Sequence, residues 1–168
     1  MKKDSEEQFE VLNSLAQQTN NFCWTLEKPE STVSLGTRLT KKFPALSILL
    51  LNGPLGAGKT TLVKGIAKGL RIKEPITSPT FPLSQHYSSG YPPLIHIDLY
   101  RIDQTSSANE FFLQEEEESK AIGGLMVVEW PERLSLPIPD AWRGKLSYSI
   151  NNTARIFQLN PPLDKDKN

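Results

Sequence analysis

The amino-acid sequence predicts an α/β fold with a mixed central sheet flanked by helices, and three observations lead to this prediction. Short, nearly continuous apolar runs such as 46–51 are typical of strands buried on both faces. Segments with apolar residues at helical spacing, such as 59–70, alternate with these runs. Only six residues join the predicted strands 81–87 and 94–98, too few for a helical crossover, so these neighbours are antiparallel.

The first half of the chain predicts two strand and helix pairs. Residues 21–26 indicate a strand, and residues 31–42 indicate a helix because their apolar residues recur at helical spacing. The apolar run 46–51 indicates the next strand. Residues 59–70 place their apolar side chains on one face and lysines opposite, which predicts an amphipathic helix.

The second half predicts a loop, a helix and further strands. Residues 75–80 are rich in proline and turn-forming residues, which favours a loop. Ser107-Ala-Asn-Glu110 matches a capping box and predicts that a helix opens there. This helix continues into four adjacent glutamates, 115–118, which we interpret as a solvated face. Residues 125–128 indicate another buried strand. The chain closes with two predicted strands, 145–150 and 155–159.

A length of 168 residues predicts one compact domain with its own core. We predict this domain over 21–160, after an N-terminal extension, 1–20, whose residues 4–18 indicate a short amphipathic helix or a partly ordered segment. A disordered tail follows over 161–168. The 19 Lys and Arg residues equal the 19 Asp and Glu residues in number, so the chain has no net positive charge that would attract nucleic acid or an anionic membrane. One cysteine and no membrane-length apolar run predict a cytoplasmic protein.

Residues Gly53–Thr60 carry the spacing G-x-x-x-x-G-K-T, which is typical of a loop that wraps the phosphates of a nucleotide. The glycines Gly53, Gly56 and Gly58 let successive backbone N–H groups turn toward the phosphates. Lys59 offers a point charge to the β and γ phosphates, and the hydroxyl of Thr60 can ligate Mg²⁺. A strand before the loop and a helix after it are the expected context, so the sequence predicts binding of ATP or GTP.

Two carboxylates and one hydroxyl are further candidates for chemistry on the nucleotide. Asp98 and Glu129 each end an apolar strand, where open α/β sheets bind ligands, so either can position Mg²⁺ or water. Thr80 lies in a loop expected near the phosphates and can sense the γ phosphate. His96 alternates with isoleucines, and we interpret it as a structural histidine. Trp130 indicates either a core residue or an exposed partner site.

Four motifs occur together in this chain, and their combination is specific. They are Leu-Gly-Ala-Gly-Lys-Thr-Thr at 55–61, Ser-Pro-Thr-Phe at 78–81, His-Ile-Asp-Leu-Tyr-Arg-Ile at 96–102 and Val-Glu-Trp-Pro at 128–131. With them, residues 22–160 resemble the TsaE family, small bacterial ATPases of tRNA threonylcarbamoyladenosine (t6A) synthesis. The resemblance implies a magnesium-dependent ATPase, slow alone, that works with TsaB and TsaD. Those partners attach the threonylcarbamoyl group, so this chain would meet tRNA indirectly.

The resemblance also implies roles for single residues. Thr60 and Glu129 would hold Mg²⁺, and Asp98 would lie beside the reacting water or in the metal shell. The segment 29–32 would lie near the nucleotide base, and Arg155 near the nucleotide. The implied nucleotide contacts are Glu30, Thr32, Leu55, Gly56, Ala57, Gly58, Lys59, Thr60, Thr61 and Arg155. The chain departs from the family where a usual Glu-x-x-Gly becomes Glu110-Phe-Phe-Leu113, and in its N-terminal extension.

Three other functions share the phosphate loop. A small-molecule kinase needs an acceptor site and an arginine-rich lid, whereas the arginines here are scattered. A GTP-dependent switch carries Asn-Lys-x-Asp, which this sequence lacks. A nucleotide-gated binding module would need no hydrolysis, and a variant that binds but does not hydrolyse ATP distinguishes it from an ATPase.

Overall fold

The computed structural model describes residues 22–163. The predicted N-terminal extension, 1–20, and residues 164–168 of the predicted tail lie outside the described residues, so the division into domain, extension and tail stays a prediction. The elements are β1 (Phe22–Leu26), α2 (Pro29–Lys42), β2 (Ile48–Asn52), α3 (Lys59–Gly69), β3 (Ser84–Tyr87), β4 (Leu94–Asp98), α4 (Thr105–Ala121), β5 (Leu125–Glu129), a 3-10 turn (Pro131–Arg133), β6 (Trp142–Tyr148) and β7 (Arg155–Asn160).

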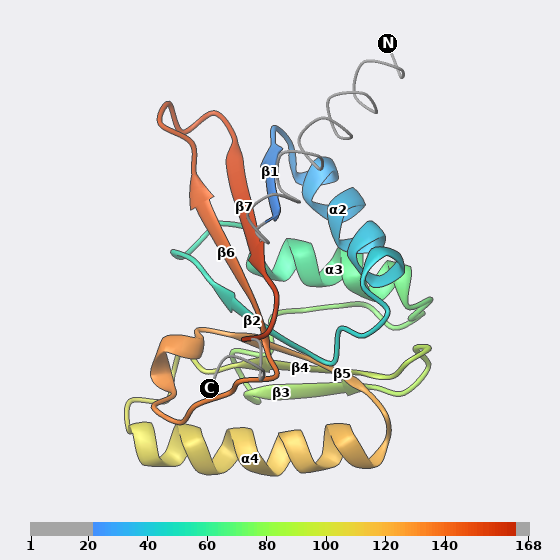
Figure 1. The fold of residues 1–168 in the computed structure, drawn as a ribbon, viewed down its shortest axis with the longest axis vertical. Coiled ribbons are helices and arrows are strands. Elements are labelled where there is room, and N and C mark those ends of the chain that lie inside the picture. Colours follow the sequence, from blue (N-terminus) through green and yellow to red (C-terminus); the bar gives the residue numbers. More distant parts are fainter. Residues whose placement is uncertain (1–21, 164–168) are drawn as a thin grey trace.

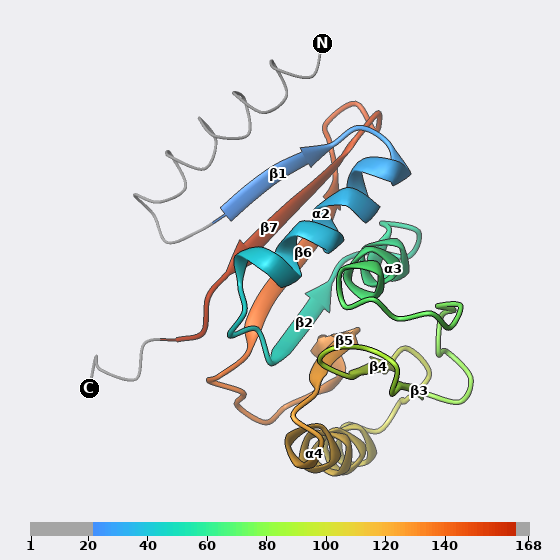
Figure 2. The same ribbon diagram turned by 90° about the vertical axis from the view of Figure 1, so that its right-hand side faces the viewer.

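Seven strands form one mixed sheet in the order β1-β7-β6-β2-β5-β4-β3. The central strands β6, β2, β5 and β4 are parallel, while β3 pairs antiparallel with β4, β7 with β6, and β1 with β7. Helices α2 and α3 cover one face of the sheet and α4 covers the other (Figures 1 and 2). The predicted fold class is confirmed, including the antiparallel pair around the six-residue connection.

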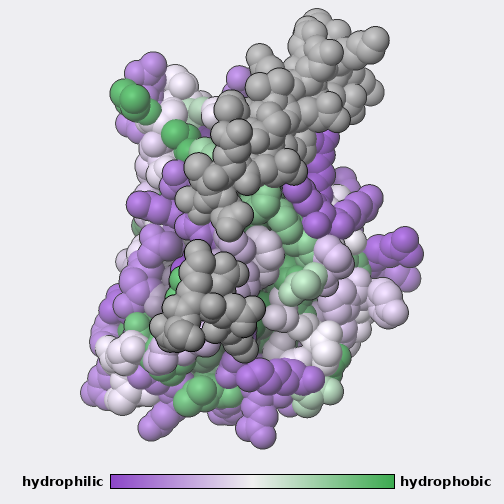
Figure 3. Space-filling model, in the orientation of Figure 1, coloured by the Kyte–Doolittle hydropathy of each residue, from purple (hydrophilic) through white to green (hydrophobic). Residues whose placement is uncertain are grey.

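The buried side chains form two clusters, one on each face of the sheet. Along β2, Leu49 and Leu51 pack with the α2 and α3 side, whereas Ile48 and Leu50 pack with the α4 side. Both faces of β2 are therefore covered, which explains why its sequence is a continuous apolar run. Hydrophilic residues dominate the face visible in Figure 3, where the hydrophobic colour forms separate patches. Within residues 22–163, no helix combines the length and apolar character needed to cross a membrane.

The start of α4 differs from the prediction. The helix begins at Thr105, and its N-cap residue Gln104 makes no side-chain capping bond, so the predicted capping box at Ser107 is wrong. The interpretation of 115–118 as a solvated face is correct for Glu117 and Glu118 but wrong for Glu115, which is buried and accepts hydrogen bonds from β3. Four adjacent helical residues turn through most of a full circle, so one of them must face the sheet.

Several element boundaries shift by a few residues. Helix α2 begins at Pro29 rather than at Ser31, because proline fits the first turn of a helix, where no N–H partner is required. Strand β3 begins at Ser84 rather than at 81, after Leu83, which adopts a φ of 81° that no strand tolerates. Strand β6 covers Trp142–Tyr148 rather than 145–150.

Helices α2 and α3 approach closely because each has a glycine at the contact. A Cβ atom added at Gly36 would lie 2.4 Å from the carbonyl oxygen of Leu62. A Cβ atom added at Gly65 would lie 2.2 Å from the carbonyl oxygen of Val33. Thr37 donates a hydrogen bond of 3.0 Å to the carbonyl oxygen of Gly65, which joins the two helices at the same place. Backbone therefore packs directly against backbone at this contact.

We expect Gly65→Ala to destabilise the protein by about 1–3 kcal/mol, because the new methyl group can only fit if the two helix backbones separate. Urea unfolding followed by circular dichroism measures this change. Lys64→Ala is the matched control, since Lys64 is exposed on the same helix and such substitutions change stability by less than about 0.5 kcal/mol. Equal unfolding free energies for the two variants would contradict the close packing of α2 on α3.

Candidate nucleotide site

Three parallel strands bring the predicted site residues to one edge of the sheet. Strand β2 ends at Asn52, directly before the phosphate loop, while β4 ends at Asp98 and β5 at Glu129. In the register, Asp98 pairs with Glu129 and Leu51 pairs with Glu129, so the three strand ends lie side by side. Parallel strands present their carboxyl ends together, which is where open α/β sheets bind ligands.

The phosphate loop connects β2 to the N-terminus of α3. Gly56 and Gly58 have φ values of 75° and 100°, which glycine adopts without steric cost, and Gly58 is the N-cap of the helix. The first N–H groups of α3 therefore open toward the loop with the positive end of the helix dipole. The hydroxyl of Tyr148 on β6 donates a 3.0 Å hydrogen bond to the carbonyl oxygen of Leu55 and ties the loop to the sheet.

Lys59 is held inside the loop, with an exposed fraction of only 5%. Its ammonium donates to the carbonyl oxygens of Gly53, at 2.6 Å, and Pro54, at 3.1 Å. The same ammonium lies 4.1 Å from the centre of the Trp130 ring, within cation–π range. Burial lowers the pKa of Lys59, and the negative charges of nearby carboxylates, chiefly Glu129, offset part of this lowering. A positive charge thus lies where the loop would enclose phosphates.

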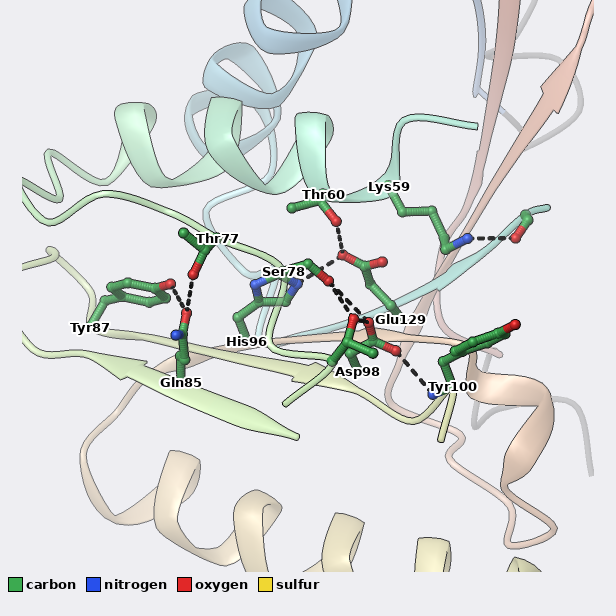
Figure 4. A network of polar contacts seen from close by, with 12 residues as sticks. Lys59, Thr60, Thr77, Ser78, Gln85, Tyr87, His96, Asp98, Tyr100 and Glu129 are labelled. Atoms are coloured by element: carbon green, nitrogen blue, oxygen red, sulfur yellow. Dashed lines mark hydrogen bonds and ion pairs between the residues drawn. The ribbon is translucent and has the colours of Figure 1, made fainter. Parts of the chain in front are cut away.

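Glu129 is the centre of a small buried network at the end of β5. Its Oε1 accepts a hydrogen bond of 2.9 Å from the hydroxyl of Thr60, the first-turn residue of α3. The same oxygen lies 2.9 Å from Nε2 of His96 on β4. Figure 4 shows the three side chains pointing toward one another between the sheet and α3. The two residues predicted to hold Mg²⁺, Thr60 and Glu129, are therefore in direct contact.

Asp98 forms a second network beside the first. Its Oδ2 accepts hydrogen bonds from the hydroxyls of Thr80, at 2.8 Å, and Ser78, at 3.2 Å. Its Oδ1 accepts the backbone N–H of Tyr100 at 2.9 Å. The loop that carries Thr80 thus lies against the strand-end carboxylate, and both networks face the same region in Figure 4.

Two hollows adjoin the phosphate loop. The first has a volume of about 240 Å³ and is lined by Leu55, Gly56, Gly58, Lys59, Thr60, Thr61, Ser78, Thr80, Asp98, Tyr100, Glu129 and Trp130. We call it the phosphate cleft. The second has a volume of about 300 Å³ and is lined by Leu26, Glu27, Lys28, Pro29, Thr32, Gly56, Ala57, Gly58, Thr61, Thr153, Ala154 and Arg155. We call it the side pocket, and it shares Gly56, Gly58 and Thr61 with the phosphate cleft.

Most predicted site residues meet at these two hollows. Lys59, Thr60, Thr80, Asp98 and Glu129 line the phosphate cleft, whereas two others, Thr32 and Arg155, line the side pocket. Gly53 lines neither hollow but accepts the hydrogen bond from Lys59. Glu30 is not brought to the site, since it lines only other grooves along α2.

Sequence reasoning missed several side chains at the site, namely Ser78, His96, Tyr100, Trp130 as a cleft residue, and Tyr148. One signal was available for His96, because residues two apart on a strand share a face and His96 precedes Asp98 by two. No comparable pattern marks Tyr148. Among residues 22–163, no group of three or more His, Cys, Asp or Glu side chains is arranged to hold a metal ion.

Comparison with known proteins identifies relatives over the same region. The sequence model of the TsaE family, described as threonylcarbamoyl adenosine biosynthesis protein TsaE, matches residues 26–156. The tRNA threonylcarbamoyladenosine biosynthesis protein TsaE of Nostoc sp. is 46% identical over 65% of this chain and 67% of that protein. The protein of the same name from Bacillus subtilis is 36% identical over 69% of this chain and 70% of its own length. The crystal structure of Bacillus subtilis YdiB matches with a TM-score of 0.60 and 26% identity, and covers 84% of this chain and 86% of that one.

Proposed function

Because this chain belongs to the TsaE family of threonylcarbamoyladenosine biosynthesis proteins, we propose that it is a magnesium-dependent ATPase that supports t6A formation in tRNA through the TsaB–TsaD complex. One observation carries the proposal: a phosphate loop of the expected sequence and two strand-end carboxylates, Asp98 and Glu129, line one cleft. Because the family acts in the modification of tRNA, we propose a cytoplasmic location for this protein as well.

The phosphate loop would bind the triphosphate of ATP. Backbone N–H groups after Gly56 and at the start of α3 donate to phosphate oxygens, and the helix dipole favours their negative charge. Lys59 would exchange its bonds to the carbonyl oxygens of Gly53 and Pro54 for bonds to the β and γ phosphates. The nucleoside would extend into the side pocket toward Thr32 and Arg155.

Thr60 and Glu129 fit the requirements of the Mg²⁺ ion that accompanies ATP. A hydroxyl and a carboxylate are hard oxygen donors, and their oxygens lie 2.9 Å apart at the edge of the phosphate cleft. Mg²⁺ in nucleotide sites is held by one or two such groups, with phosphate oxygens and water as its other ligands. When bound, Mg²⁺ neutralises charge on the β and γ phosphates during phosphoryl transfer.

Asp98 and Thr80 would act on the γ-phosphate side of the cleft. Three donors hold the carboxylate of Asp98 in one orientation, so it can accept a hydrogen bond from the attacking water or from water in the metal shell. The hydroxyl of Thr80 can leave Asp98 for a phosphate oxygen, which would make its loop sensitive to the presence of the γ phosphate.

Co-purification with TsaB and TsaD tests nucleotide and partner together. We expect the chain to associate with the TsaB–TsaD pair in the presence of ATP and Mg²⁺, and to hydrolyse ATP faster in their presence, because a partner can complete an otherwise slow site. Lys59→Ala is the control for nucleotide dependence, since it keeps the rest of the surface. A mixture that shows no association in ATP, while isolated TsaB and TsaD do associate with each other, would contradict the proposed role.

A further inference from the structure

His96 is a buried polar side chain to which the proposed chemistry gives no role. It lies in the middle of β4 with an exposed fraction of 0%, and its side chain is on the same sheet face as Asp98. In the parallel register, His96 lies beside Val127, two residues before Glu129 on β5. Its imidazole therefore reaches diagonally to the end of the neighbouring strand β5, as Figure 4 shows.

The surroundings of the ring determine which nitrogen carries the proton. Nε2 lies 2.9 Å from Oε1 of Glu129, while Nδ1 is buried and has no hydrogen-bond partner among the described residues. A proton on Nδ1 alone would leave a buried N–H unsatisfied and would point the Nε2 lone pair at a carboxylate oxygen, both of which are unfavourable. A proton on Nε2 points a donor at the carboxylate oxygen, so His96 donates to Glu129.

The two donors to Glu129 act on one oxygen. Oε1 accepts from the hydroxyl of Thr60 and from Nε2 of His96, and among the described residues no hydrogen bond reaches Oε2. Two hydrogen bonds to one carboxylate oxygen lie near the plane of the carboxylate, so together they fix that plane. The direction of the other oxygen, Oε2, is then fixed as well. Thr60 donates its proton to Glu129 in this arrangement, which leaves the lone pairs of its hydroxyl oxygen available to a ligand.

We propose that His96 is a positioning residue that acts through Glu129: its Nε2–H fixes the carboxylate so that Oε1 orients the Thr60 hydroxyl and Oε2 stays available to Mg²⁺–nucleotide. This inference rests on the proposed function, since it assumes that Mg²⁺ accompanies ATP in the cleft. Hydrogen-bond partners of metal-site ligands hold those ligands in the orientation that binding requires. A leucine or valine at 96 would pack the core without supplying that hydrogen bond.

Two substitutions separate the hydrogen bond from the packing. His96→Gln can place an amide N–H near the position of Nε2, whereas His96→Leu keeps an apolar side chain and removes the donor. Leu94→Val is the matched control, because Leu94 is fully buried on the same strand and the same face. The readout is the ADP and ATP affinity measured by calorimetry with Mg²⁺ and, separately, with EDTA.

We expect His96→Leu to lose about tenfold or more of the affinity gain that Mg²⁺ confers, with the affinity in EDTA unchanged, because the loop still binds the phosphates. His96→Gln should retain most of the gain, and Leu94→Val all of it. The Mg²⁺ concentration for half-maximal ATP turnover should rise in His96→Leu and in no other variant of the set.

Other outcomes overturn the inference. If His96→Leu keeps the full Mg²⁺-dependent gain, or loses affinity equally in Mg²⁺ and in EDTA, the histidine does not position Glu129. If His96→Leu does not fold, His96→Asn replaces it, since asparagine is polar but too short to reach Glu129; equal Mg²⁺ dependence of His96→Gln and His96→Asn then overturns the inference. If the unsubstituted protein shows neither Mg²⁺-dependent binding nor ATP turnover, the proposed function itself fails, and that result needs no variant.

Discussion

Lys59→Ala should remove most of the affinity of this protein for ATP. The ammonium of Lys59 is almost fully buried and supplies the positive charge inside the phosphate loop. Removing one partner of a buried, hydrogen-bonded charge pair costs about 2–5 kcal/mol, which corresponds to roughly a thirtyfold to several-thousandfold loss of affinity at 1.4 kcal/mol per tenfold. Calorimetric titration with ATP and Mg²⁺ measures the loss directly.

A matched control makes the Lys59 result specific. Lys64→Ala removes a lysine of the same helix that is exposed to solvent, so it tests whether a general loss of positive charge weakens binding. Circular dichroism establishes that Lys59→Ala still folds without the bonds to Gly53 and Pro54. Unchanged ATP binding in a folded Lys59→Ala protein would show that the loop does not bind phosphates.

Glu129→Ala should separate binding from hydrolysis. We expect the phosphate loop still to bind ATP, without the gain in affinity that Mg²⁺ confers, and turnover to fall by about a hundredfold or more, because interactions that strengthen in the transition state affect the rate more than the ground-state affinity. The substitution removes the carboxylate that orients Thr60 and leaves the Nε2–H of His96 without its acceptor. Steady-state release of phosphate measures turnover, and calorimetry measures binding.

A control variant and a second substitution of Glu129 are needed to interpret the turnover of Glu129→Ala. Glu110→Gln on α4 is the control, since it changes an exposed carboxylate on the opposite face of the sheet from α3. Normal turnover in Glu129→Ala would contradict the assignment. Glu129→Gln also distinguishes the ATPase from a nucleotide-gated binding module: if this variant binds ATP, does not hydrolyse it and still supports t6A formation fully, the hydrolysis is dispensable.

Local patterns were sufficient to predict most of the fold. The bounds of β4, 94–98, and the phosphate-loop helix at Lys59 follow from apolar runs and from the spacing of the loop motif. The N-terminus of α4 could not be predicted from its motif, because Ser107 matches a capping box but lies inside the first turns of the helix. A capping pattern gives only a local preference, and the packing of Ala108 and Phe112 on the sheet decides where α4 lies.

The candidate site was predictable where chemistry restricts the residue type, as in the phosphate loop, or where an acid ends an apolar strand, as at Asp98 and Glu129. Phosphate binding requires glycines, a lysine and a hydroxyl in a fixed order, so residues 53–60 can be recognised as a phosphate loop from the sequence alone. The contact between His96 and Glu129 depends instead on the register of β4 against β5. The contact between Tyr148 and Leu55 joins residues 93 positions apart. Such contacts arise from tertiary packing, which no local window of sequence contains.

The close contact between α2 and α3 has a mechanical consequence for the site. Backbone rests on backbone at Gly36 and Gly65, so the two helices cannot slide past one another without a collision. Since α3 follows the phosphate loop and the N-terminal end of α2 borders the side pocket, this packing fixes the position of the loop relative to that pocket.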